Sequence, residues 1–297
     1  MITEAATDFT HTFGRNGKFR IGTASSLEER RKAYGMVYHL YRMRGYAEWK
    51  KSGMWLSLYN LLPDTVTLTV YQGNELAGTL TVVFDGPLGL PCDGLYGEEI
   101  DELRNPGRRP AEIISLGVVD ADRRDSRDIL VKLFNYVYLV SWHLRGATDF
   151  VITVNPHHAA YYRRTLLFEN RGSERSYGKV GGAPAVLLRL NLEIPDRAVA
   201  DPEAKELRER THYRFFHTME EEQEILPALR RTLTPMSEEE FEFFAMDETD
   251  LWAHASPREK EYLAEHYFTA LLGLEGNRGV FAAPPSLPPE RALQEVS

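Results

Sequence analysis

A predicted hairpin followed by a strand that leads into a long helix is the feature that most limits the fold of this chain. Segments 65–71 and 76–84 alternate apolar and small polar residues, and Gly73-Asn74 lies between them. This pattern predicts two antiparallel strands joined by a tight turn. Segment 112–119 is an apolar strand, and an amphipathic helical pattern follows it. A hairpin beside strand–helix–strand units requires a mixed sheet with helices on both faces, an α/β (α+β) fold.

The alternation of strand and helix patterns continues over residues 1–195, in the order β-α-β-β-α-β-α-β-α-β. Further strands are predicted at 19–22, 150–154 and 185–192, with a short one near 173–177, and further helices at 27–44, 94–104, from 127 onward and at 156–168. Ser26 stands before the first helix with Glu29 three residues later, the pattern of a capping box. This part of the chain is therefore expected to form one sheet-centred domain.

A change in charge marks a boundary near residue 195. The whole chain carries 35 Lys and Arg residues against 44 Asp and Glu residues, but residues 1–195 are nearly neutral and residues 196–297 hold most of the excess acid. The segment 192–202 at the change contains two prolines. Residues 196–297 are expected to form an acidic, all-helical extension that packs through Phe241 and Phe244, with a disordered stretch at 283–289.

Composition excludes several classes of protein. No run reaches the roughly 18 apolar residues of a membrane helix, and the first 16 residues lack an apolar signal segment. Cys92 is the single cysteine, which excludes an internal disulfide, and it is interpreted as a free thiol without a special role. The nine histidines show no metal-binding spacing, so no metal site is expected. We expect a cytoplasmic protein that does not bind nucleic acid.

The most informative segment is the strand at 112–119 with the turn that follows it. The turn leads into the long helix through Arg123, Arg124, Ser126 and Arg127. A helix N-terminus attracts anions because its first backbone N–H groups have no partner in the helix and its dipole is positive there. The cluster predicts a phosphate site, and the alternative is a solvent-exposed charge run, because aspartates alternate with the arginines.

This strand, turn and helix, with the second strand and the segment 155–168, resemble the GNAT acyltransferase superfamily. In that superfamily the turn binds the donor's phosphates through the motif Arg/Gln-x-x-Gly-x-Gly. With Arg124 at the first position, Arg127 and Ile129 stand where the glycines belong, so the backbone cannot wrap a pyrophosphate closely. The resemblance thus implies a donor with a single phosphodiester, which arginines suit. The acyl-phosphopantetheine of acyl carrier protein is such a donor, with acyl-CoA as the second candidate and no permanently bound cofactor.

Five segments in order look like the long-chain N-acyl amino acid synthases, GNAT-fold relatives of the acyl-homoserine-lactone synthases. They are residues 78–91, the acidic helix after them, 111–118, 161–168 and 182–188. The resemblance spans residues 19–190 and does not reach the extension. It implies an acyltransferase of lipid biosynthesis that moves a long-chain fatty acyl group from acyl carrier protein to the amine of an amino acid. Ser115 stands where the lactone synthases carry arginine, which weakens an interpretation as a lactone synthase.

The same resemblance implies roles for individual residues. Glu112 is expected to be the general base, although a strand-start glutamate is most often a solvated edge residue. The backbone near Gly117 and Val118, where such strands bulge, would donate to the oxyanion, and Tyr162 would protonate the departing thiolate unless its neighbour Tyr161 does so. The expected donor-binding residues are Arg123, Arg124, Ser126 and Arg127, the acceptor-binding residues are Arg42, Arg44 and Ser115, and the acyl-chain residues are Trp55, Leu56, Val186 and Leu188.

Two other functions stay open at this point. One is an acetyl-CoA-dependent GNAT acetyltransferase, which the missing glycines disfavour. The other is a non-catalytic module that binds acyl chains or carrier protein. In either case the acidic extension could pack on the basic face at Arg123 and Arg124 and compete with an acidic carrier protein, or it could simply complete the fold. A peripheral contact of the product with a membrane is also expected.

Overall fold

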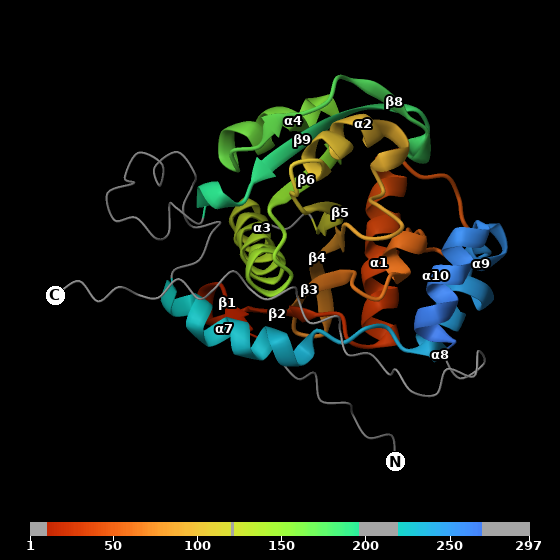
Figure 1. Ribbon diagram of the computed structural model, residues 1–297. Coiled ribbons are helices and arrows are strands. Elements are labelled where there is room, and N and C mark those ends of the chain that lie inside the picture. Colours follow the sequence, from red (N-terminus) through yellow and green to blue (C-terminus); the bar gives the residue numbers. More distant parts are fainter. Residues whose placement is uncertain (1–10, 120–121, 196–218, 269–297) are drawn as a thin grey trace, which may run out of the picture.

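A nine-stranded mixed sheet forms the centre of the computed structural model, which describes residues 11–119, 122–195 and 219–268 (Figure 1). The strand order is β1-β2-β3-β4-β5-β6-β9-β7, and β8 pairs with β9. The strands are β1 (His11–Phe13), β2 (Phe19–Thr23), β3 (Val66–Gln72), β4 (Glu75–Phe84), β5 (Pro110–Val118), β6 (Asp149–Val154), β7 (Glu169–Asn170), β8 (Arg175–Tyr177) and β9 (Ala183–Asn191).

Only the pairing of β5 with β6 is parallel among the described strands, and all other pairs are antiparallel. The β3–β4 hairpin turns at Gly73-Asn74, and Gly73 has a positive φ of 59°, a conformation that glycine adopts at no steric cost. The predicted mixed sheet is therefore confirmed, with its hairpin in the expected place.

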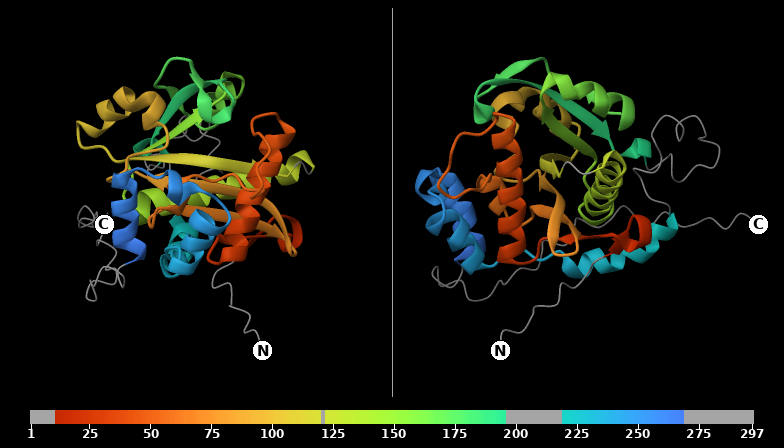
Figure 2. Two further views of the ribbon diagram at one scale, coloured as in Figure 1. Left: turned by 90° about the vertical axis from the view of Figure 1, so that its right-hand side faces the viewer. Right: turned by 180° about the vertical axis from the view of Figure 1, so that it is seen from behind.

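Helices cover both faces of the sheet, as predicted (Figures 1 and 2). One face carries α1 (Leu27–Met43) and α2 (Asp93–Arg104), and the other carries α3 (Arg123–Tyr138), its π-helical continuation η3 (Leu139–Leu144) and α4 (Pro156–Thr165). Two glycines in the sheet allow α1 and α3 to approach it closely. A methyl group on Gly117 would meet Leu40 of α1, and one on Gly78 would lie 2.6 Å from Ile129 of α3.

The structure adds details that the sequence pattern did not predict. The strands β1 and β7 were not expected. Ser26 does cap α1 by accepting from the Glu29 N–H, but the Glu29 carboxylate accepts from the backbone and hydroxyl of Ser25 rather than from Ser26. The predicted capping box is thus half formed, and the return contact moves one residue toward the N-terminus.

The C-terminal helices pack on the sheet-centred part of the chain. They are α7 (Met219–Thr232), α8 (Glu238–Glu242), the π-helical turn η6 (Phe243–Asp247), α9 (Leu251–His254) and α10 (Pro257–Tyr267). Capping boxes at Ser237 and Ser256 begin α8 and α10, as predicted. The predicted disordered stretch at 283–289 lies outside the described residues. No helix in the described part is long and apolar enough to cross a membrane.

These helices pack into two separate hydrophobic clusters. Phe241 and Phe244 are fully buried in a cluster with Tyr34 of α1, Met54 and Leu61. In contrast, α7 contributes to the main core between the sheet and α3. Among the described residues, no ion pair joins the extension to Arg123 or Arg124; its buried pair is Arg30–Glu240, at 2.6 Å. The described helices of the extension therefore pack on α1 and on the main core, and the suggested competition with carrier protein at Arg123 and Arg124 stays a prediction.

Candidate active site

The strands β5 and β6 separate in the middle of the sheet. They pair only from Pro110 to Glu112, so the edge of β5 that faces β6 has no ladder partner from Ile113 onward among the described residues. A β-bulge then follows, because Thr81 pairs with Ile114 and Thr79 with Gly117. Ser115 lies in this bulge and has a positive φ of 54°, an uncommon conformation for a non-glycine residue that occurs often at functional sites.

The bulge lies two residues before the predicted position. The backbone N–H groups of Gly117 and Val118, which follow it, point in different directions. The Val119 N–H donates to the Ala77 carbonyl of β4 at 3.0 Å. Since successive N–H groups in a strand point to opposite edges, the Val118 N–H points toward the open edge and the Gly117 N–H points toward β4. Of the two N–H groups expected to donate to the oxyanion, only that of Val118 therefore faces the open edge of β5.

Glu112 lies at the last paired position before β5 and β6 separate, and only 2% of it is exposed. Its Oε2 accepts a hydrogen bond of 2.7 Å from the Cys92 backbone N–H, and its Oε1 accepts one of 3.4 Å from the Thr153 hydroxyl. Cys92 is the N-cap residue of α2. The carboxylate therefore sits at the positive end of that helix, where an anion is favoured.

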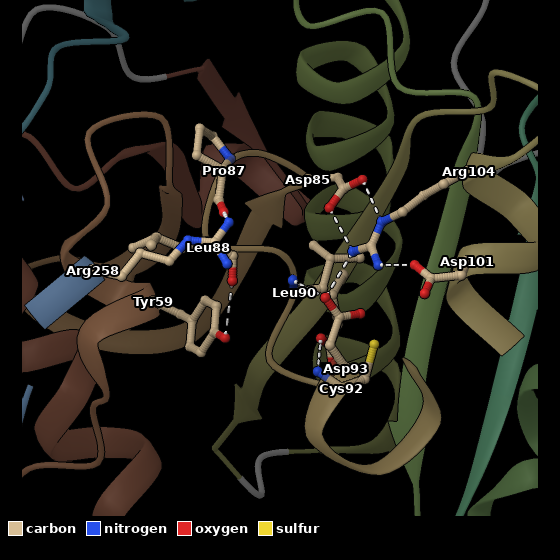
Figure 3. Close-up of polar contacts among 11 residues, drawn as sticks. Tyr59, Asp85, Pro87, Leu88, Leu90, Cys92, Asp93, Asp101, Arg104 and Arg258 are labelled. Atoms are coloured by element: carbon tan, nitrogen blue, oxygen red, sulfur yellow. Dashed lines mark hydrogen bonds and ion pairs between the residues drawn. The ribbon is translucent and has the colours of Figure 1, made fainter. Parts of the chain in front are cut away.

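An arginine on α2 fixes the loop that delivers Cys92 to this position (Figure 3). The Arg104 guanidinium donates to both carboxylate oxygens of Asp85, at 2.8 and 2.7 Å, and to Asp93 at 2.8 Å. Asp93 in turn accepts from the Leu90 N–H at 2.9 Å. Because a bidentate pair restricts both orientation and distance, the loop between Asp85 and Asp93 is tied at both ends.

Two further contacts hold the middle of the same loop (Figure 3). The Tyr59 hydroxyl donates to the Leu88 carbonyl at 3.4 Å, and Arg258 of α10 donates to the Pro87 carbonyl. The C-terminal extension thus contacts the loop that positions Cys92, whose N–H donates to Glu112. The substrate-lining role considered for residues 85–91 stays a prediction.

The Cys92 side chain also belongs to this arrangement. Burial raises the pKa of the Cys92 thiol well above its ordinary value, and the negative charge and hydrogen bond of Glu112 raise it further. The thiol is therefore held neutral beside the carboxylate. The free thiol was expected, and its position next to Glu112 was not.

Two tyrosines, Tyr59 and Tyr177, lie near Glu112. Burial raises the pKa of Tyr59 to about 12, and Asp93 and Glu112 add to this effect. Burial also raises the pKa of Tyr177, with Glu112 and Cys92 as the next causes. Tyr177 of β8 and Tyr59 therefore both lie within electrostatic range of the Glu112 carboxylate.

Tyr162 lies on α4, where its ring packs edge-on against Phe168 with 5.8 Å between centroids. Burial raises its pKa, and the next cause is Tyr41 of α1, which also acts on Tyr177. Tyr161 is exposed on the same helix. The structure thus places Tyr162, rather than Tyr161, toward the tyrosines near Glu112.

The predicted donor turn is exposed at Arg123, Arg124 and Arg127, and Ser126 is half-buried. One anion already occupies the helix start, because the Asp122 carboxylate accepts from the Arg124 N–H at 2.7 Å. A phosphate would therefore have the arginine side chains and the remaining N–H groups of the first turn as partners. Arg127 also lowers the pKa of Tyr161, against the larger effect of burial, which places this arginine beside α4.

The predicted acceptor residues lie at two different places. Arg42 and Arg44 are exposed at the end of α1, and Arg44 contributes to lowering the pKa of His158 on α4, after burial and His157. Ser115 lies in the bulge, only 7% exposed. No hydrogen bond among the described residues joins Ser115 to Arg42 or Arg44, and the acceptor role of the three residues stays a prediction.

The four predicted acyl-chain residues are also separated. Trp55 packs on Tyr41, with 5.0 Å between ring centroids. Leu56 is buried in the cluster under the C-terminal helices, and Leu188 is fully buried in the main core. Val186 is half-buried opposite Val154 at the end of β6. Of the four, Val186 and Trp55 have surface left for a substrate.

Thr153, Tyr59, Tyr177 and Tyr41 were not expected at the site. Thr153 lies two positions after Val151, the register partner of Glu112, so the strand pattern could have pointed to it. The three tyrosines come from α1, the turn η2 (Leu58–Leu61) and β8, which no local pattern connects. They reach the site only through the tertiary fold.

The chain is similar to known proteins over this same region. A family model described as N-acyl amino acid synthase FeeM matches residues 32–191. The solved structure of FeeM, an N-acyl amino acid synthase from uncultured soil microbes, shares 25% identity and a TM-score of 0.53, covering 65% of this chain and 94% of that one.

Two other solved structures resemble the fold at lower scores. The acyl-homoserine-lactone synthase LasI shares 14% identity and a TM-score of 0.46, covering 62% of this chain and 91% of that one. An acyl-CoA N-acyltransferase from Pseudomonas aeruginosa shares 14% identity and a TM-score of 0.41, covering 58% of this chain and 97% of that one. A comparison with curated protein sequences finds no significant match.

Proposed function

The chain belongs to the FeeM family of N-acyl amino acid synthases, with a GNAT-like fold and N-acyltransferase activity, and we propose that it transfers a long-chain fatty acyl group from acyl carrier protein to the amine of an amino acid. The observation that carries the proposal is the position of Glu112. It is the buried carboxylate at the point where β5 and β6 separate, so it can act where the open strand edge offers backbone donors.

Glu112 is proposed as the general base. An amino acid's amine is protonated at neutral pH and must lose a proton before it attacks a thioester carbonyl carbon. A carboxylate held by the Cys92 N–H and Thr153 at distances of 2.7 and 3.4 Å has its lone pairs partly occupied and its position restricted. It can accept the proton directly or through one water.

Val118 and Tyr162 are proposed to support the two remaining steps, which are stabilisation of the oxyanion and protonation of the leaving thiolate. As the amine nitrogen bonds to the carbonyl carbon, negative charge develops on the carbonyl oxygen, and the Val118 N–H on the open edge is a fixed donor for it. The carbon–sulfur bond then breaks, and the thiolate takes a proton. Tyr162 suits this step because burial keeps its hydroxyl protonated. The second proton that the amine nitrogen loses as the amide forms restores the Tyr162 hydroxyl, and the first proton, held on Glu112, returns to solvent.

The donor is proposed to be a carrier protein because of the charges at the α3 turn. Arg123, Arg124 and Arg127 are exposed, Asp122 already caps the helix, and no glycine permits a close wrap around a pyrophosphate. The single phosphodiester of an acidic carrier protein can be bound by cationic side chains, with few hydrogen bonds from backbone N–H groups. The half-buried Val154 at the end of β6 and its partner Val186 on β9 offer apolar surface to an acyl chain, and each methylene that a long chain buries contributes roughly 0.8 kcal/mol.

Donor and acceptor are tested together by mixing the purified full chain with a long-chain acyl carrier protein or the matching acyl-CoA. Each donor is combined with a panel of amino acids, and products are identified by mass spectrometry. The proposal predicts an N-acyl amino acid, formed faster from the carrier protein than from the CoA thioester. The charge-reversing variant Arg124→Glu should lower the carrier-protein rate more than the CoA rate, with Arg163→Glu on α4 as an exposed control. Product from acetyl-CoA alone would reject the long-chain donor.

A further inference from the structure

Two large apolar side chains stand exposed on one tip of the molecule, residues 42–51. Met43 and Trp49 are 72% and 73% exposed, the highest values among the large hydrophobic residues that the structure describes. Single exposed apolar residues are common on soluble proteins. Two large ones on the same short segment, both mostly in solvent, point to an interaction surface.

The tip is a defined structure. The chain leaves α1 through Gly45, whose φ is 72°, and folds back along the helix. The Lys50 N–H donates to the Tyr38 hydroxyl at 2.7 Å, and Lys50 Nζ lies over the Trp55 ring, 4.9 Å from its centroid. These contacts fix the residue that follows Trp49, and the end of α1 lies at the margin of the molecule (Figure 2).

The charges around these two side chains are mostly positive. Arg42, Arg44, Lys50 and Lys51 alternate with the apolar residues, against the single carboxylate of Glu48, and all five are exposed. None of the four cations forms an ion pair with a described residue. Since the whole chain has a net charge of -9, this tip is a local exception to its acidity.

The tip also borders the candidate active site. Tyr41, one residue before Arg42, packs on Trp55 and acts electrostatically on both Tyr162 and Tyr177. Arg44 acts on His158 at the start of α4. These contacts place the tip next to the tyrosines that lie near Glu112.

We propose that residues 42–51 dock on an anionic lipid surface. Trp49 and Met43 enter the headgroup region, where tryptophan is favoured, and the four cations bind the anionic headgroups. Each lysine or arginine near such a surface strengthens binding about fivefold, and the effect falls with salt. The proposal rests on the proposed function for its purpose, because a long-chain N-acyl amino acid is insoluble enough to need delivery to a bilayer.

An acidic carrier protein is the other macromolecule that four cations could attract. The lipid surface is favoured because a carrier protein would need arginines and lysines but not two largely exposed apolar side chains. The exposed arginines at the α3 turn suit the carrier protein better, because their apolar neighbours Val119 and Tyr161 are each only 42% exposed, against 72% for Met43 and 73% for Trp49.

The test is vesicle binding by the full chain without substrates. Phosphatidylcholine vesicles are compared with vesicles in which part of the lipid is phosphatidylglycerol, by co-sedimentation and by tryptophan emission. Binding to the anionic vesicles should weaken with salt and shift the emission to shorter wavelength. Trp49→Ser should weaken binding about tenfold and remove most of the shift, and Lys51→Glu should weaken binding by more than tenfold. The matched control is Met246→Ser, an exposed apolar residue on η6, which should change neither.

Three outcomes overturn the proposal: no binding by the unchanged chain, equal binding by Trp49→Ser, or a Trp49→Ser defect that appears only as slower reaction with carrier protein in the absence of vesicles. The last would assign the tip to the carrier protein. Binding that follows the prediction in a chain that makes no N-acyl amino acid would contradict the proposed function alone, so the two failures can be told apart.

Discussion

The backbone N–H of Cys92 donates a hydrogen bond of 2.7 Å to Oε2 of Glu112, and this bond joins the start of α2 to the last residue of β5 that pairs with β6. The two residues are 20 positions apart. The bond orients a buried carboxylate toward the place where the sheet opens, and it uses the backbone of Cys92 rather than its thiol.

Two substitutions at Cys92 separate the backbone from the side chain. Cys92→Ala keeps the N–H and should retain most of the acyltransferase activity. Cys92→Pro removes the N–H at a φ of -79°, which proline tolerates, and it should lower the turnover rate roughly 10- to 100-fold, the effect of losing a hydrogen bond to a charged group. Equal rates for the two variants would show that this bond does not position Glu112.

The unchanged Cys92 thiol should react slowly with iodoacetamide in the folded protein at pH 8. Burial and the Glu112 charge raise its pKa, and the thiolate is the reactive form. Denaturant should expose it and restore the rate of an ordinary cysteine, measured by mass spectrometry. Rapid alkylation of the folded chain would contradict the neutral thiol beside Glu112.

The Arg30–Glu240 pair should be the main polar link between the C-terminal helices and α1. Its side chains are 7% and 12% exposed, so Glu240→Ala leaves a buried guanidinium without its carboxylate. The free energy of unfolding should fall by roughly 3 kcal/mol or more, as measured by denaturant titration. Glu238→Ala, an exposed residue in the same helical turn, is the control and should cost much less. Similar losses for both variants would mean that the pair contributes no more than a surface charge.

His143 predicts how stability depends on pH. Burial lowers its pKa to about 4, from an ordinary value of 6.5. Between these values the unfolded chain binds a proton here that the folded chain does not, so the free energy of unfolding falls as the pH falls through this window, by up to about 3 kcal/mol. His143→Gln should flatten the curve between pH 6.5 and 4, whereas the exposed His39→Gln should not. An unchanged curve in His143→Gln would contradict the lowered pKa.

Sequence patterns within one segment predicted the features that depend only on interactions between neighbouring residues. The hairpin at Gly73, the caps at Ser237 and Ser256, and the strand–helix order all follow from turn, capping and periodicity rules that need only neighbouring residues. The family resemblance from several ordered segments was confirmed as well. In contrast, β1 and β7 have three and two residues, too few for any alternation to be detected, and they form only because a partner strand is present.

The candidate site shows the limit of such prediction. Glu112 could be named from its strand, but its partners Cys92 and Thr153 come from other elements, and Ser115 adopts its positive φ without a glycine to indicate it. Leu56 and Leu188 are equally apolar in sequence, yet one lies under the C-terminal helices and the other in the main core. Hydrophobicity predicts burial and does not tell which core receives a side chain.

The base assignment is tested most directly by the single-turnover rate of Glu112→Gln with a long-chain acyl carrier protein and an accepted amino acid. Glutamine keeps the shape and an acceptor for the Cys92 N–H but cannot take a proton, so the rate should fall by at least roughly 100-fold with the free energy of unfolding little changed. Glu98→Gln, an exposed residue on α2, should react at the unchanged rate. Full activity of Glu112→Gln would contradict the account.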